Sequence, residues 1–158
     1  MATKTKLTEA EVAAWRALLS GHSRVTRLLD AELTAECGQS LGSYEVLLLL
    51  ASAPDRRLRM TDLAERAFLS RSGITRLVDR LVAEGLVSRE RCAGDARVTY
   101  AAITAEGQDR LRLAAPVHLR GVREHVTGQF SDAELDTLAT LLGRIADPLT
   151  GAEPDCSV

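Results

Sequence analysis

Residues 60–81, MTDLAERAFLSRSGITRLVDRL, decide the fold of this chain. Thr61 is placed to cap a short helix over residues 62–67, and Ser70 is placed to cap a longer helix over residues 71–84. The longer helix carries one apolar stripe at spacings of three and four residues, formed by Ile74, Leu77, Val78 and Leu81. Two short helices joined by a tight turn predict a helix-turn-helix.

The opposite face of the longer helix is polar, and a face of hydroxyl and guanidinium groups can enter the major groove of duplex DNA. We expect the first turns to supply contacts to bases and phosphates, from Ser70, Arg71, Ser72, Thr75 and Arg76. Arg80 lies farther along the helix and is expected to contact a phosphate. The alternative is that these side chains form a solvated helix surface.

The sequence changes to a period of two after the helix-turn-helix. Residues 86–91 and 98–103 each alternate, which predicts two short strands joined in a hairpin by residues 92–97. Such a hairpin would form a wing with Arg97 near its tip, and a narrow minor groove attracts arginine. Asp95 can hold the Arg97 side chain in an ion pair.

Helical segments flank this module on both sides. A capping box, Thr8-x-x-Glu11, opens a helix that ends near Gly38, and Thr104 can cap a helix after the hairpin. A second capping box, Ser131-x-x-Glu134, opens the last helix.

The order of these elements predicts one domain of mainly α class with a small β-hairpin wing. We expect a single domain over residues 1–158, a winged helix-turn-helix over residues 41–103, and dimerisation helices over residues 7–37 and 104–147. Because the flanking helices need an apolar surface to pack on, a twofold homodimer is the economical arrangement.

The charge of the chain is unevenly distributed. The formal net charge is -2, which alone argues against a nucleic-acid partner. Residues 56–97, however, carry ten arginines and six acidic residues, for a charge of +4, so the rest of the chain carries -6. A compact basic module is typical of a domain that faces a phosphate backbone. Within it, Arg56, Arg57 and Arg59 are either phosphate contacts or a solubilising connector, and Arg89 and Arg91 are more simply surface residues.

These segments together resemble the MarR family of winged-helix transcriptional regulators. The resemblance covers roughly residues 7–146 and rests on an ordered set of motifs: LGSYEVL (41–47), MTDLA (60–64), LSRSGITRLVDRL (69–81), EGLV (84–87), Asp95-x-Arg97 and ITAEG (103–107). It implies a sequence-specific regulator of transcription, an obligate dimer with interlocked terminal helices, and a pseudo-palindromic operator in double-stranded DNA. A ligand-responsive repressor is the leading interpretation.

The resemblance also implies an effector pocket between the dimer helices and the winged module. The candidate effector-binding residues are Trp15, His22, Tyr44 and His118, and the expected ligand is a small aromatic or phenolic compound. For Trp15 the simpler interpretation is a core or dimer-interface residue, and the histidines can equally be structural or surface residues.

Several other classes are excluded or disfavoured by the sequence. The longest apolar run, residues 46–51, is too short to span a membrane, and no secretory signal is present, so a cytoplasmic location is the default. Three widely spaced cysteines without a CxxC motif support neither a zinc site nor a disulfide framework. The common catalytic motifs are absent, so we expect no enzyme, no cofactor and no metal site.

A thiol-based redox switch on the same fold is the alternative function. It would use one or more of Cys37, Cys92 and Cys156. Arg91 is one residue that could lower the pKa of a thiol at Cys92.

Overall fold

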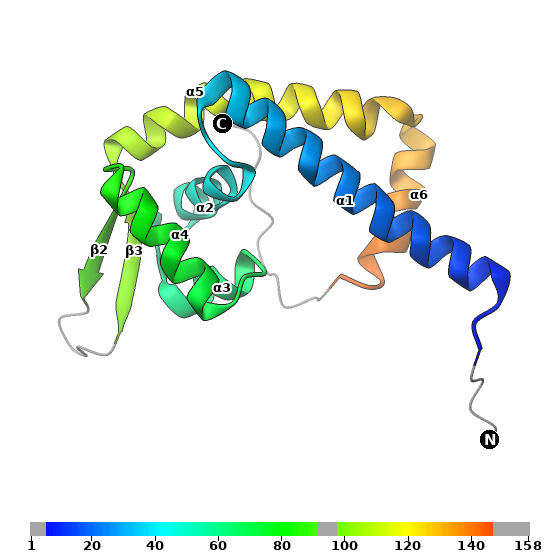
Figure 1. The fold of residues 1–158 in the computed structure, drawn as a ribbon, viewed down its shortest axis with the longest axis horizontal. Helices are drawn as coiled ribbons and strands as arrows, with labels where there is room; N and C mark the ends of the chain where they lie inside the picture. Colours follow the sequence, from blue (N-terminus) through cyan, green and yellow to red (C-terminus); the bar gives the residue numbers. More distant parts are fainter. Residues whose placement is uncertain (1–5, 92–97, 147–158) are drawn as a thin grey trace.

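A computed structural model describes residues 6–91 and 98–146. In chain order its elements are α1 (Glu9–Cys37), α2 (Leu41–Ser52), η1 (Pro54–Arg56), β1 (Arg57–Arg59), α3 (Met60–Arg66), α4 (Arg71–Ala83), β2 (Val87–Arg91), β3 (Thr99–Ile103), α5 (Ala105–His125), η2 (Thr127–Gln129) and α6 (Asp132–Gly143). In Figure 1, α5 runs along the top of the molecule, with α2, α3, α4 and the strands beneath its first half and α6 at its far end. The prediction of a mainly helical winged helix-turn-helix is confirmed.

The predicted helix starts are mostly confirmed by their capping hydrogen bonds. The Thr8 hydroxyl accepts from the Glu11 amide at 3.3 Å, and the Ser131 amide donates to the Glu134 carboxylate at 2.8 Å. Thr104 caps α5 through the Gly107 amide at 3.0 Å. The expected cap at Thr61 is wrong, because α3 begins at Met60, two residues before the predicted start, and Arg59 occupies the N-cap position.

The sheet contains one strand more than the sequence predicted. Its order is β1-β3-β2, with Leu58 opposite Ala101 and Val87 opposite Ile103 in antiparallel pairs. The segment interpreted as a connector, residues 56–59, therefore contains β1. Three residues carry too little periodicity to show a strand, and β1 exists because it pairs with a strand more than 40 residues away.

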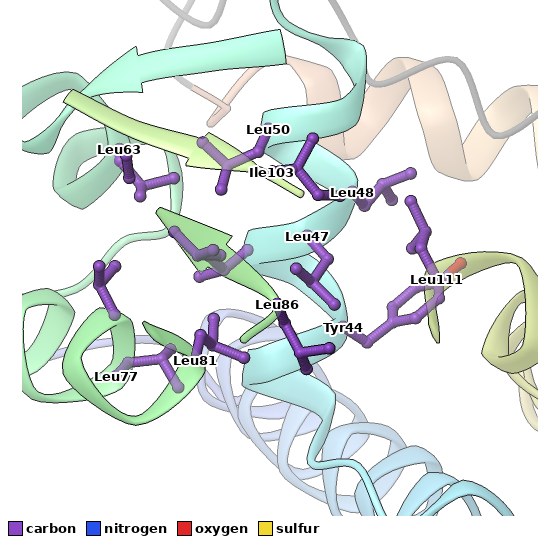
Figure 2. Close-up of a cluster of buried hydrophobic side chains, with 14 of the residues drawn as sticks. Tyr44, Leu47, Leu48, Leu50, Leu63, Leu77, Leu81, Leu86, Ile103 and Leu111 are labelled. Atoms are coloured by element: carbon purple, nitrogen blue, oxygen red, sulfur yellow. The ribbon is translucent and has the colours of Figure 1, made fainter. Parts of the chain in front are cut away.

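The hydrophobic core surrounds α2. Figure 2 shows Leu47 and Leu50 of α2 among side chains that come from α3, α4 and the sheet. The largest side chains that are almost fully buried are Leu33, Leu47, Leu50, Leu63, Ile74, Leu81, Leu111, Val46 and Val78. Burying each of the larger ones contributes about 1.5–3 kcal/mol to the hydrophobic free energy of folding. This core fixes α4 against α2 and α3, and so decides which face of α4 remains outside.

The turn of the helix-turn-helix places an aromatic residue in a backbone conformation that favours glycine. The Phe68 amide donates to the Glu65 carbonyl at 3.1 Å and the Leu69 amide to the Ala64 carbonyl at 3.0 Å, which is the Schellman pattern. Phe68 has φ of 51° and its side chain is 82% exposed. The end of α4 uses the same pattern with Gly85 at φ of 75°. Phe68 therefore carries strain that Gly85 does not.

We predict that Phe68→Gly stabilises the protein. The left-handed conformation costs a residue with a side chain about 1–2 kcal/mol, and glycine avoids this cost. Glycine also raises the conformational entropy of the unfolded chain, which offsets about 0.4–1 kcal/mol of that stabilisation. The midpoint of urea denaturation at fixed protein concentration should rise, whereas Phe68→Ala, which keeps the strain, should leave it nearly unchanged. A lower midpoint for Phe68→Gly would show that the turn is not strained.

Candidate nucleic-acid interface

The face of α4 predicted to meet DNA is exposed. Ser70 caps the helix by accepting from the Gly73 amide at 3.1 Å, and the apolar stripe of the helix is buried. The polar side chains predicted for the outer face, Arg71, Ser72, Thr75, Arg76 and Arg80, are all exposed, and so is Asp79 on the same helix. The structure therefore brings the six described DNA-contact candidates, Ser70, Arg71, Ser72, Thr75, Arg76 and Arg80, to one surface. Asp95 and Arg97 lie outside the described residues.

Two of these side chains make hydrogen bonds along the helix itself. The Thr75 hydroxyl donates to the Arg71 carbonyl at 2.7 Å, and the Arg76 Nε donates to the Ser72 carbonyl at 3.3 Å. A bond through Nε orients the guanidinium group of Arg76 while its terminal nitrogens retain donors that suit a guanine edge or a phosphate.

Arg89 of β2 bonds the wing to α4, which is the recognition helix of the predicted helix-turn-helix. The sequence does not reveal this contact. The guanidinium group of Arg89 lies 2.7 Å from the Asp79 carboxylate and donates to the Thr75 carbonyl at 3.4 Å. The sequence favours a plain surface residue at position 89, and it does not reveal these partners because they lie ten or more positions away in the chain. The exposed face of α4 carries one acidic residue, Asp79, which would be unfavourable next to a phosphate. Its pairing with Arg89 explains its presence, since Asp79 orients an arginine of β2.

The surface is hollowed on both sides of α4. One hollow of about 580 Å³ lies between α4 and the wing, and its polar and charged lining comprises Arg59, Thr61, Thr75, Arg89, Arg91 and Thr99. The other, of about 340 Å³, lies between the start of α2 and α4, with a lining that includes Ser40, Gly42, Leu69, Gly73, Arg76 and Arg80. The recognition helix thus stands as a ridge between two hollows lined with arginine, a shape and charge that suit a groove bordered by phosphates.

The arginines before α3 are held by partners within the chain. Arg56 donates to Gln108, and Arg57 lies 3.1 Å from the Glu90 carboxylate with its Cζ 5.1 Å from the Tyr100 ring centre. The hydrogen bond that Arg57 donates to Glu90 raises the pKa of Arg57 above its ordinary value. Arg59 donates from Nε to the Tyr100 hydroxyl at 3.2 Å. The contacts of Arg57 and Arg59 tie β1 to β2 and β3, and the contact of Arg56 ties η1 to α5, so the three residues have a structural role in addition to their charge.

The structure brings together two of the four candidate effector residues. The Tyr44 ring stacks on the His118 ring with centres 4.4 Å apart, which joins α2 to α5. Burial lowers the pKa of His118, and among the residues that the structure describes none bonds to its buried Nδ1. Trp15 and His22 lie apart from this pair on exposed turns of α1, and Trp15 is 54% exposed. Of the two simpler interpretations of Trp15, a core or a dimer-interface residue, its exposure in the single chain leaves the dimer interface.

His22 acts electrostatically on a different residue of α2. Burial raises the pKa of the Glu45 carboxyl, and the charge of His22 partly opposes that shift. His22 of α1 therefore lies close enough to Glu45 of α2 for its charge to act on that carboxyl.

One further group in the described ranges, 6–91 and 98–146, could hold a metal ion: Glu32, Glu124 and His125. The sequence did not reveal it, because 93 positions separate Glu32 from His125. Cys37 is half-buried at the end of α1, and Cys92 and Cys156 lie outside the described residues. A search of the described helices finds none that is long and apolar enough to cross a membrane.

Comparison with known proteins agrees with this geometry. Residues 38–98 match the sequence model of the MarR family. The HTH-type transcriptional repressor YetL of Bacillus subtilis (strain 168) is 35% identical over 113 residues, which span 72% of this chain and 67% of that protein. The homoprotocatechuate degradative operon repressor of Escherichia coli is 29% identical over 99 residues, which span 63% of this chain and 65% of the repressor.

A solved structure gives the same result over a longer stretch. Sco3205, a MarR family transcriptional regulator from Streptomyces coelicolor whose structure was determined in complex with DNA, is 34% identical and superposes with a TM-score of 0.85. The match covers 93% of this chain and 96% of Sco3205. These relatives are regulators and not enzymes, and the chain described here belongs to the MarR family of DNA-binding transcriptional regulators.

Proposed function

We propose that this chain is a homodimeric repressor that binds a pseudo-palindromic operator and responds to a small aromatic or phenolic effector. The observation that carries the proposal is the exposed polar ridge of α4 between two hollows lined with arginine. The DNA complex of Sco3205 supports it, since that relative has the same fold.

Each described candidate has a distinct part in this proposal. Ser70 and Arg71 meet a phosphate at the start of α4, where free backbone N–H groups favour an anion. Arg76 reads a guanine edge, Ser72 and Thr75 contact neighbouring bases or phosphates, and Arg80 contacts a phosphate. Arg97, positioned by Asp95, contacts the minor groove, as the sequence predicts.

We predict that Arg76→Ala weakens operator binding by about 1–3 kcal/mol and relaxes base preference at one position in each half-site. The operator is obtained by selection from random duplex DNA, and affinity is measured across a salt series. Arg80→Ala should instead weaken binding to all sequences and reduce the salt slope by about 1.

The matched control is Arg112→Ala, which removes an exposed arginine of α5 that bonds to Asp109. It should leave both affinity and salt slope unchanged. A flat salt response of the wild-type protein, or wild-type affinity in Arg76→Ala and Arg80→Ala, would show that the interface lies elsewhere.

The dimer is supported by apolar side chains that this single chain leaves exposed. On α1 they include Trp15 and Leu19, and at the end of α6 and just beyond it they include Leu141, Leu142 and Ile145. Within the described part of the chain, no residue of α6 is buried. An isolated helix of this length is marginal in water, so α6 needs an apolar partner surface, which a second copy supplies.

Leu142→Glu is expected to shift the protein from dimer to monomer in sedimentation velocity, because it places a charge in the proposed apolar interface. Operator affinity should fall with it, since two half-sites are no longer bound together. Asp136→Ala, at an exposed polar position of the same helix, should remain dimeric. A wild-type protein that sediments as a monomer at micromolar concentration would exclude the proposed dimer.

The effector proposal rests on the Tyr44–His118 stack. An aromatic ring pair with a buried, neutral imidazole nitrogen offers stacking and a hydrogen bond to a phenol or carboxylate. The E. coli relative is named for repression of a homoprotocatechuate degradative operon, which favours an aromatic ligand. An effector releases DNA only by binding more tightly to a dimer geometry that does not fit the operator.

A panel of phenols and aromatic acids should contain compounds that raise the melting temperature of the wild-type protein, because a ligand that binds the folded state stabilises it. The same compounds should not raise the melting temperature of His118→Ala. They should also leave the operator affinity of this variant unchanged. Equal stabilisation of wild type and His118→Ala would place the effector away from this pair.

The thiol-based alternative stays a prediction. Cys37, the one cysteine among the described residues, is half-buried at the end of α1. Joint replacement of Cys37, Cys92 and Cys156 by serine would exclude the alternative if oxidant and effector responses are retained.

A further inference from the structure

Three side chains with metal-binding atoms converge where α1 crosses the end of α5. Glu32 comes from α1, and Glu124 and His125 come from the last turn of α5. One ligand atom from each lies within 4.8 Å of the other two, and His125 Nε2 is 2.5 Å from Glu32 Oε1. The side chains of His125 and Glu32 are 17% and 27% exposed, so these two are largely withdrawn from solvent, whereas Glu124 is exposed.

The Glu32 carboxylate is held there with one oxygen unsatisfied. Its Oε2 is buried, and within residues 6–91 and 98–146 nothing donates a hydrogen bond to it. The helices approach closely at Gly121, where an added Cβ would lie 2.5 Å from Oε2 and 2.6 Å from Leu29 Cδ2. Burying a carboxylate oxygen without a partner costs free energy of folding, and a cation bound to this carboxylate would offset that cost.

We propose that Glu32, Glu124 and His125 bind a divalent transition-metal ion, with Zn²⁺ as the best match. One imidazole nitrogen and two carboxylate oxygens are a donor set that Zn²⁺ accepts, whereas Mg²⁺ and Ca²⁺ prefer oxygen alone. Bonds of about 2.0–2.2 Å in a tetrahedral site hold ligand atoms about 3.4 Å apart. That spacing falls within the 4.8 Å over which the three ligand atoms are gathered. Water fills the fourth position.

The charges around the cluster allow this assignment. With His125 neutral, the three ligands carry two negative charges, which a divalent ion neutralises. Arg120, one turn earlier on α5, is bonded to Glu36 of α1 and so is already paired. Arg123 borders the open hollow beside Glu124 and is exposed to solvent, which screens its charge.

A bound ion would tie α1 to α5. Both helices belong to the part of the chain proposed to form the dimer, so the ion would stabilise that part directly. The competing interpretation is a simple hydrogen-bonded pair of Glu32 and His125, which needs no ion.

The test uses full-length protein in which the three cysteines are replaced by serine, since thiolates also bind Zn²⁺. After treatment with EDTA, Zn²⁺ is titrated in by calorimetry and the melting temperature is measured with and without the ion. The result expected is one Zn²⁺ per chain and a higher melting temperature. His125→Gln and Glu124→Gln should each weaken binding at least tenfold.

Glu36→Gln is the matched control, because it neutralises another carboxylate of α1 that pairs with α5 outside the cluster. It should bind Zn²⁺ as the parent does. Because Glu124 is exposed, Glu124→Gln keeps the test valid even if substitutions at buried positions impair folding. Absence of Zn²⁺ binding by the parent protein, or unchanged affinity in both His125→Gln and Glu124→Gln, would overturn the proposal.

Discussion

Burial of the apolar stripe of α4 is the constraint on which the rest of the structure depends. Ile74, Leu77, Val78 and Leu81 are buried, so the helix cannot rotate without exposing them to water. Its polar face is therefore fixed outward, Ser70 sets where the helix begins, and Gly85 sets where it ends. The chemistry presented to a partner thus follows from a packing requirement that involves none of the residues on the exposed face.

Contacts among polar side chains then join the wing to this helix. The Arg89–Asp79 pair connects β2 to α4, and Tyr100 holds Arg57 and Arg59 of β1 against β3. Exposed contacts of this kind are individually weak, and an exposed ion pair such as Arg89–Asp79 contributes about 0–1 kcal/mol. Their value here is geometric, because they keep the recognition helix and the base of the wing in one relative position, as simultaneous contacts to two grooves would require.

The sequence predicted what depends on local pattern and missed what depends on distant pairing. The stripe and cap of α4 and the capping boxes of α1 and α6 are local signals, and the structure has all of them. The strands β2 and β3 are also present where alternation predicts them, although burial along them does not alternate. The strand β1, the partners of Arg89 and the Glu32–Glu124–His125 cluster each join residues that are far apart in the chain. No periodicity marks such contacts, and they become visible only once the helices are placed.

The central claim is that α4 enters the major groove, and interference by methylation of the operator tests it most directly. Methylation of guanine N7 alters the major-groove edge that an arginine would read, and methylation of adenine N3 alters the minor groove. The account predicts that N7 methylation within two half-sites, spaced about one helical turn apart, prevents binding. Binding that tolerates N7 methylation throughout the operator and is blocked only by N3 methylation would contradict it.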